Sequence, residues 1–357
     1  MMQGKQNSGF YDLYRDPMAG NPDPGGYTYV AGYGFAPPPR EAYERRMIRH
    51  YSSNIGFMLL AFLAGAGILY NLIFGVLTAS RKGLLFYLDF TSVSALANMA
   101  AYTLALLVPA VLYCKYIRIP QQSAFPMQRP SKMQVALAAV PVTLMVSVVG
   151  ASCSTAIASV FASVGLLPVS PDFTPPVGVF SFTLFFLSNA VLPAVVEELV
   201  FRGAIMQSLR RFGDSFALLI SSLLFGIVHG NLVQAPMAFL SGMAIGYFVL
   251  HTGSLRTGML IHFVNNAASV LLTAIAVNLS ADTQLLFYNS VYLIYIVAGL
   301  FGMAYLLRQN PNMFYLHRSS TVMGMRGKLL AFFSTAGIWL MLGMSLLSIS
   351  RYFLVLF

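Results

Sequence analysis

The chain has 357 residues, of which 57% are hydrophobic and only 9% are charged, and its formal net charge is +10. A soluble domain has about 25% charged residues, so this chain could not cover a water-facing surface with polar groups. The composition therefore excludes a soluble globular enzyme, a disordered protein and a coiled coil. It indicates an all-α, polytopic membrane protein. The excess of Lys and Arg then reports topology and anionic lipid, so we expect the lipid bilayer as a partner and no nucleic acid.

The N-terminal segment differs in composition from the rest. Residues 1–39 are rich in Gly, Pro, Tyr and Asn, which is typical of a disordered segment. A charged stretch follows, so we assign residues 1–50 to a cytoplasmic tail with a basic juxtamembrane segment. Transmembrane helices are expected over 51–177, over a central segment at 178–280 and over 281–357.

Nine apolar stretches are long enough to span a membrane, which needs about 20 mostly apolar residues. They lie near 54–79, 94–114, 133–167, 178–201, 215–233, 235–252, 257–279, 285–307 and 329–350. The third is too long for one straight span, so we expect it to tilt, kink or continue along the surface. Nine spans put 18 Lys and Arg on one side and three on the other. The positive-inside rule therefore predicts eight to nine spans with a cytoplasmic N-terminus.

Ionisable side chains inside the spans are rare. Of eleven Asp and Glu residues, only Glu197 and Glu198 lie within an apolar stretch, and His229 and His262 lie within neighbouring spans. A carboxylate at the bilayer centre costs about 2.5–3.5 kcal/mol on the insertion scale. Two adjacent carboxylates with two histidines therefore predict a functional site.

The spacing of these residues predicts their roles. Glu198 and Arg202 are four residues apart, with the acid first, which favours an ion pair on one helix face. We interpret this pair as structural. Glu197 is rotated by about 100° from Glu198 and has no cation at that spacing, so it remains the chemically free carboxylate. Burial would suit it to act as a general base.

Two further pairs project from neighbouring spans. His262 and Asn266 share one helix face, and Phe225 and His229 share another. Three helices can thus direct Glu197, His229, His262 and Asn266 into one cavity. A carboxylate and an imidazole can hold and deprotonate a water, while an imidazole and a carboxamide can stabilise an oxyanion. This combination of groups can catalyse the attack of water on an amide.

These residues resemble the three-motif signature of the CPBP family, which comprises the type II CAAX prenyl proteases and their bacterial Abi relatives. The motifs are Glu197-Glu198-x-x-x-Arg202, Phe225-x-x-x-His229 and His262-x-x-x-Asn266, with Thr252-Gly253-Ser254-Leu255 similar to the lead-in of the last. The resemblance covers about residues 180–270. It implies an intramembrane endopeptidase with its catalytic core in 178–280. It also implies that Glu197 and His229 activate water, and that His262 and Asn266 form the oxyanion hole.

Depth constrains this hypothesis. If the fourth span ended at Arg202, Glu197 would lie at the membrane edge while His229 lay deep. Extending that helix to about Phe212 brings the two to similar depth, about 20 Å from the flanking charges at 1.5 Å per residue. His262 remains only six residues beyond Arg256. Helix tilt, a re-entrant start or a snorkelling Arg256 would each reconcile it.

Other functions stay open. Intramembrane Glu and His also build transporters, and a family-like protein could be a non-proteolytic scaffold or immunity factor. Two His and two Glu could bind zinc. We expect no cofactor, because the adjacent glutamates diverge and no His-Glu-x-x-His pair is present. The substrate is expected to be a membrane-associated peptide or protein. The Abi resemblance suggests a multi-pass protein of a bacterial plasma membrane.

Overall fold

A computed structural model of the chain describes residues 28–30, 34–36, 40–79, 88–171, 173–316 and 321–355. The charged residues Arg81, Lys82, Asp172 and Arg318 lie outside these ranges, as does most of the predicted disordered tail. The predicted tail includes β1 (Thr28–Val30) and β2 (Gly34–Ala36), which instead pair as antiparallel strands. The β-branched and aromatic residues of these two short segments favour strands, which the overall composition of the tail concealed.

The rest of the described chain is almost entirely helical, and seven helices are long and apolar enough to cross a membrane. Six are single helices: α2 (Arg40–Ala79), α3 (Phe90–Tyr116), α5 (Met133–Ser163), α10 (Ala235–Thr252), α11 (Leu255–Ala276) and α12 (Ala281–Gln309). The seventh runs from Val179 to Phe212 and is called here the fourth span. The protein is therefore an all-α, multi-pass integral membrane protein. Its orientation relative to the cytoplasm stays a prediction.

Two predicted spans differ from straight membrane crossings. The fifth is α9 (Asp214–Val228), whose 15 residues give about 22 Å, against a hydrocarbon core of about 30 Å. The ninth is broken into α13 (Met325–Phe332) and α14 (Ala336–Ser350), which meet at 74° and together would make an eighth span. Ser52 of α2 stabilises this break, because its hydroxyl donates to the carbonyl of Phe332 and lies 2.9 Å from Thr335 Oγ1.

The fourth span extends beyond the apolar stretch that predicted it, which ended near residue 201. It comprises α6 (Val179–Phe186), η2 (Leu187–Val191), α7 (Leu192–Glu197), η3 (Glu198–Ile205), α8 (Met206–Leu209) and η4 (Arg210–Phe212). The predicted extension to Phe212 is confirmed, and the helix ends at Gly213, whose φ of 112° is readily adopted only by glycine. Glu197 consequently lies near the middle of the span.

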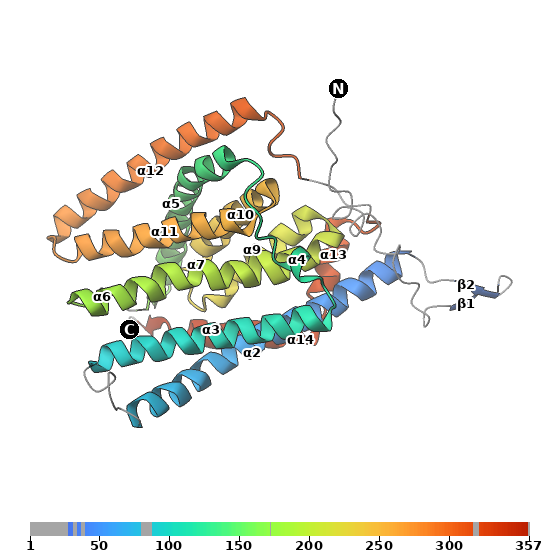
Figure 1. The fold of residues 1–357 in the computed structure, drawn as a ribbon, viewed down its shortest axis with the longest axis horizontal. Coiled ribbons are helices and arrows are strands. Elements are labelled where there is room, and N and C mark those ends of the chain that lie inside the picture. Colours follow the sequence, from blue (N-terminus) through green and yellow to red (C-terminus); the bar gives the residue numbers. More distant parts are fainter. Residues whose placement is uncertain are drawn as a thin grey trace.

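The fourth span runs through the centre of the bundle (Figure 1), with α2 and α3 on one side and α11 on the other. α5 packs against α10 and α12, while α14 packs against α2. The long third stretch resolves into α5, which contains Pro141, followed by β3 (Leu166–Pro168). β3 pairs with β4 (Phe353–Val355) near the C-terminus.

Polar residues stabilise two of the connections between the helices. α3 begins at Asp89, whose carboxylate accepts a hydrogen bond from the backbone N–H of Ser92. Hydrogen bonding by Ser92 holds the pKa of the Asp89 carboxyl below its ordinary value. On the other side of the bundle, α4 (Gln121–Ala124) precedes a loop that covers the turn between α10 and α11.

Candidate active site

The fourth span departs from α-helical geometry next to its carboxylates. η2 and η3 are both π-helical, and Glu197 ends the α-helical turn between them. π-turns in helices are rare and often lie at functional sites, because each one displaces neighbouring side chains from their α-helical directions. Glu197 and Glu198 thereby stand at a change of helix type, with exposed fractions of only 8% and 0%.

A buried ion pair anchors the second carboxylate. Arg202 NH1 donates to Glu198 Oε1 at 2.6 Å, and both side chains are 0% exposed. Arg202 also donates to the carbonyl of Gly242 on α10 at 3.2 Å and lies 4.3 Å above the ring of Phe225 on α9. Gly242 permits this approach, because an added Cβ would lie 3.1 Å from the guanidinium. The pair therefore joins three helices.

His262 lies between the two carboxylates. Its Nδ1 is 2.9 Å from Glu198 Oε1, and its Nε2 is 3.6 Å from Glu197 Oε2. Since a carboxylate oxygen only accepts, Nδ1 carries the proton of that bond. Glu198 thus has two partners, Arg202 and His262, where the sequence predicted only the first. It orients the imidazole as well as the fourth span.

The shallow position predicted for His262 is explained by the turn between α10 and α11. Ser254 and Leu255 are fully buried, because Ser254 Oγ donates to the Gln128 carbonyl and the Leu255 N–H donates to the Pro126 carbonyl. The start of α11 is therefore covered by the loop after α4. Six residues from Arg256 suffice to bring His262 level with Glu198.

His229 caps the C-terminus of α9 at the other side of Glu197. Its Nδ1 donates to the carbonyl of Phe225 at 2.7 Å, since a carbonyl can only accept. In the neutral imidazole this leaves Nε2 as an acceptor. The Phe225 ring packs edge-on against both histidines, with centroids 4.9 Å from His229 and 5.8 Å from His262. Phe225 is thus the common packing partner of Arg202 and both imidazoles.

Asn266 is held by the backbone of the fourth span. Pro193 has no N–H to donate to the carbonyl of Asn189, four residues earlier, and Asn266 Nδ2 donates to that carbonyl at 3.2 Å. The carboxamide has a second N–H that this bond does not use. The neighbouring Asn265 turns toward α5, where its Oδ1 accepts from Ser147 Oγ at 2.8 Å.

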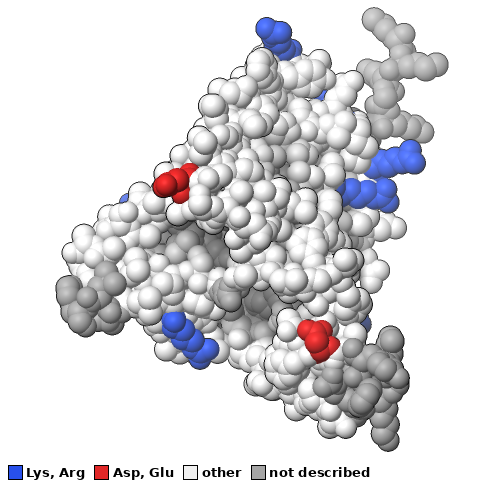
Figure 2. Space-filling view, turned by 90° about the vertical axis from the view of Figure 1, so that its left-hand side faces the viewer, with Lys and Arg blue, Asp and Glu red and all other residues white. Residues whose placement is uncertain are grey.

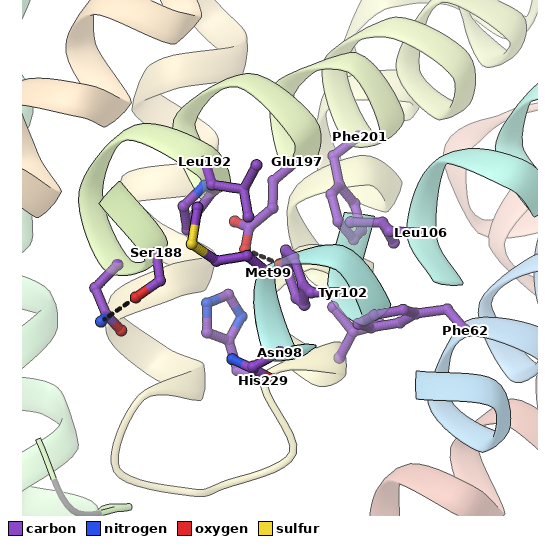
Figure 3. Close-up of a pocket in the computed structure, with 13 residues that line it drawn as sticks. Phe62, Asn98, Met99, Tyr102, Leu106, Ser188, Leu192, Glu197, Phe201 and His229 are labelled. Carbon is purple, nitrogen blue, oxygen red and sulfur yellow. Dashed lines mark hydrogen bonds between the residues drawn. The ribbon is translucent and has the colours of Figure 1, made fainter. Parts of the chain in front are cut away.

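One cavity of about 220 Å³ has Glu197, His229, His262 and Asn266 all in its wall. A second cavity of about 280 Å³ lies on the α2 and α3 side of Glu197 and also reaches His229. Figure 3 shows the Glu197 carboxylate and the His229 ring facing this second cavity from opposite sides. Its other walls are largely apolar: Phe62, Met99, Leu106, Leu192, Phe201 and Val228. Figure 2 shows the surface hollowed between helices at the end of the bundle where α3 and α6 begin, with few charged side chains around it.

The sequence did not single out several polar residues around Glu197. Tyr102 of α3 donates a hydrogen bond to Glu197 Oε1, and Asn98, Asn189, Gln234 and Ser241 line the cavities. Asn189 could have been found from the sequence, because it is a carboxamide within an apolar stretch. Tyr102 could not, because tyrosines are common in membrane spans.

The same Glu and His side chains are possible metal ligands. Among the described ranges, no group of three or more His, Cys, Asp or Glu side chains is arranged to hold a metal ion. Glu198 Oε1 is engaged by Arg202 and His262, and His229 Nδ1 by a backbone carbonyl.

Comparison with known proteins identifies the segment that carries this site. Residues 179–268 match the family described as type II CAAX prenyl endopeptidase Rce1-like, over about a quarter of the chain. Comparisons with curated proteins and with solved structures gave no match. The matched segment contains all three motifs, and the described part of the chain has seven candidate spans, or eight if the bent pair α13–α14 forms one. The chain is therefore a multi-pass membrane protein that contains a segment similar to the type II CAAX prenyl endopeptidase family.

Proposed function

We propose that the protein is an intramembrane endopeptidase that hydrolyses a membrane-associated peptide or protein with a water activated by Glu197. The observation that carries the proposal is the convergence of Glu197, His229, His262 and Asn266 on one cavity of about 220 Å³. A buried carboxylate beside an imidazole acceptor can bind and deprotonate water, which is the demanding step of amide hydrolysis.

The proposed reaction begins with a water between Glu197 and His229. Glu197 takes one proton while the water oxygen attacks the scissile carbonyl carbon, and His229 Nε2 accepts the second O–H hydrogen bond. The carbonyl oxygen becomes an oxyanion, to which Asn266 donates its unused N–H. A proton on His262 Nε2 would let this nitrogen donate a second hydrogen bond to the oxyanion, while Nδ1 remains bonded to Glu198. Glu197 then passes its proton to the leaving nitrogen, so the C–N bond breaks to a carboxylic acid and an amine.

Metal-free catalysis is part of this proposal. It is supported by the engagement of Glu198 with Arg202 and His262, which leaves that carboxylate poorly placed to ligate zinc. If peptide cleavage by the purified protein persists in the presence of a zinc chelator, the zinc alternative fails. If the chelator stops cleavage and zinc restores it, metal-free catalysis is wrong.

The first prediction concerns the proposed base. Glu197→Gln should lower kcat/KM by at least about 100-fold, the usual contribution of a general base. A bond cleaved in membranes containing the wild-type protein but not in membranes lacking it supplies a synthetic test peptide. The matched control is Glu41→Gln, which removes a carboxylate from an exposed ion pair with Arg45 on α2.

The control variant should cleave this peptide like the wild type. Equal cleavage by folded, membrane-inserted Glu197→Gln would disprove the mechanism. Cleavage by purified protein in detergent also distinguishes a peptidase from a transporter, because transport needs two compartments. A scaffold or immunity factor would leave the peptide intact.

A further inference from the structure

Tyr102 stands apart from the family motifs but contacts the proposed base. It lies on α3, outside the matched residues 179–268, and its hydroxyl donates to Glu197 Oε1. Figure 3 shows this bond reaching Glu197 across the edge of the cavity next to α3. A helix outside the matched segment therefore supplies a direct partner of the central carboxylate.

This hydrogen bond makes the two oxygens of Glu197 different. Oε1 accepts from Tyr102, whereas Oε2 is buried and accepts no hydrogen bond from the described part of the chain. Oε2 lies 3.6 Å from His262 Nε2. A free carboxylate rotates easily about its last torsion, so that either oxygen can take either position. One donor fixed to Oε1 removes that freedom and keeps Oε2 toward the histidines.

The position of Tyr102 is itself determined by packing. Its ring packs edge-on against Phe62 of α2, with centroids 5.7 Å apart, and α2 and α3 pack along each other. The phenol is rigid except for rotation of its hydroxyl hydrogen. The α2–α3 pair thus holds a donor against the fourth span, as a ligand-orienting side chain does in other enzymes.

We propose that Tyr102 is a positioning residue that assigns the two oxygens of Glu197, leaving Oε2 to take the proton of the attacking water. The inference rests on the proposed peptidase function and extends it to a residue outside the family segment. Tyr102 does not exchange a proton in this proposal. It acts through the orientation of Glu197.

The test compares two tyrosines of the same helix. Tyr102→Phe removes only the hydroxyl that reaches Glu197. Tyr113→Phe is the matched control, because Tyr113 lies on the same helix and its buried hydroxyl is 2.8 Å from Ser208 Oγ, away from the site. The probe is the peptide whose cleavage depends on Glu197. Tyr102→Phe should lower kcat about tenfold with little change in KM, since one hydrogen bond to a charged group is lost. Tyr113→Phe should keep the wild-type kcat.

Two results would overturn the proposal. One is a wild-type kcat in Tyr102→Phe. The other is an equal loss of kcat in both variants together with a lowered melting temperature, which would show a role in stability alone.

A second measurement needs no substrate. Dicyclohexylcarbodiimide is an apolar reagent that modifies carboxyl groups in membranes, and mass spectrometry can follow its addition to Glu197. Freed from Tyr102, Oε1 should react several-fold faster in Tyr102→Phe than in the wild type and in Tyr113→Phe. Equal rates in all three would refute the positioning role. If the wild type cleaves no peptide, the proposed function fails, and these labelling rates alone decide the inference.

Discussion

At the scale of single residues, burial decides what an ion pair contributes. The chain contains two Glu–Arg pairs at the same four-residue spacing: Glu198–Arg202, which is 0% exposed, and Glu41–Arg45, which is more than half exposed. Both have short N–O distances, of 2.6 and 2.9 Å. In water an exposed pair contributes little, whereas a buried charge left without its partner is strongly destabilising.

This contrast gives a prediction for stability. Arg202→Ala should destabilise the protein by about 3–5 kcal/mol, because the buried charge of Glu198 would lose its guanidinium partner and keep only the hydrogen bond from His262. Arg45→Ala should cost at most about 0.5 kcal/mol. Thermal unfolding of both variants in detergent measures the difference. Similar melting temperatures for the two would show that Arg202 does not stabilise the bundle.

Individual residues also show how far the sequence could go. Because each ionisable group in a span is costly, the scarcity of charge was enough to predict that Glu197 and the two histidines line one cavity. The second partner of Glu198, His262 Nδ1, could not be foreseen from spacing along one helix, because it comes from α11. Tyr102 was missed for the same reason: it contacts Glu197 from a distant segment of the chain.

At the scale of helices, glycine sets how closely the site helices approach. An added Cβ on Gly258 of α11 would lie 2.6 Å from Glu198 Oε2 and 2.7 Å from Val249 Cγ2. Distances this short force a neighbour to move. The neighbour here is a buried carboxylate already bound to Arg202 and His262.

Gly258→Ala should therefore lower both activity and melting temperature, because it displaces Glu198 and with it His262. The matched control is Gly343→Ala on α14, where nothing lies within 4 Å of the added methyl group. That variant should be neutral or stabilise by up to about 1 kcal/mol, as expected for Gly to Ala in a helix. Peptide cleavage and unfolding of both variants check this. Full activity in Gly258→Ala would mean that Glu198 does not need its present position.

The helices themselves were predictable where an apolar run ends at a polar boundary, as at the start of α12. They were mispredicted where apolar residues continue past a backbone break. Leu232 and Val233 prolong the fifth apolar run, but α9 has already ended at His229 and Gly230 has a φ of 66°. Hydropathy averages over such a turn, so it reports an apolar segment without reporting its direction.

At the scale of the whole molecule, the predicted topology survives the shortness of α9. Whether the α9–α10 hairpin crosses the bilayer or turns within it, the chain enters and leaves on the same side. The turn at 229–234 contains no Lys or Arg, so the distribution of 18 against three is also unaffected. A cytoplasmic N-terminus thus remains the prediction.

Cysteine labelling tests that orientation at the two ends of α12, whose 29 residues give about 44 Å. In a background with Cys114 and Cys153 replaced by Ala, Ala281→Cys should react with a membrane-impermeant maleimide in intact cells. Asn312→Cys should react only after permeabilisation. Both positions are exposed. The reverse pattern would place the N-terminus outside.

The shortness of α9 has a consequence for the bilayer around the protein. The tip of the hairpin, after about 22 Å of helix, bears Asn231 and Gln234, which bond each other at 2.7 Å beside His229. Lipid tails cannot solvate such groups, and irregular backbone at this depth is stable only where protein or water covers it. If the hairpin turns within the bilayer, its polar tip interrupts the hydrocarbon beneath it and admits water there. A helix too short to cross the membrane would thus give the proposed hydrolysis its second reactant, water, at the depth of Glu197.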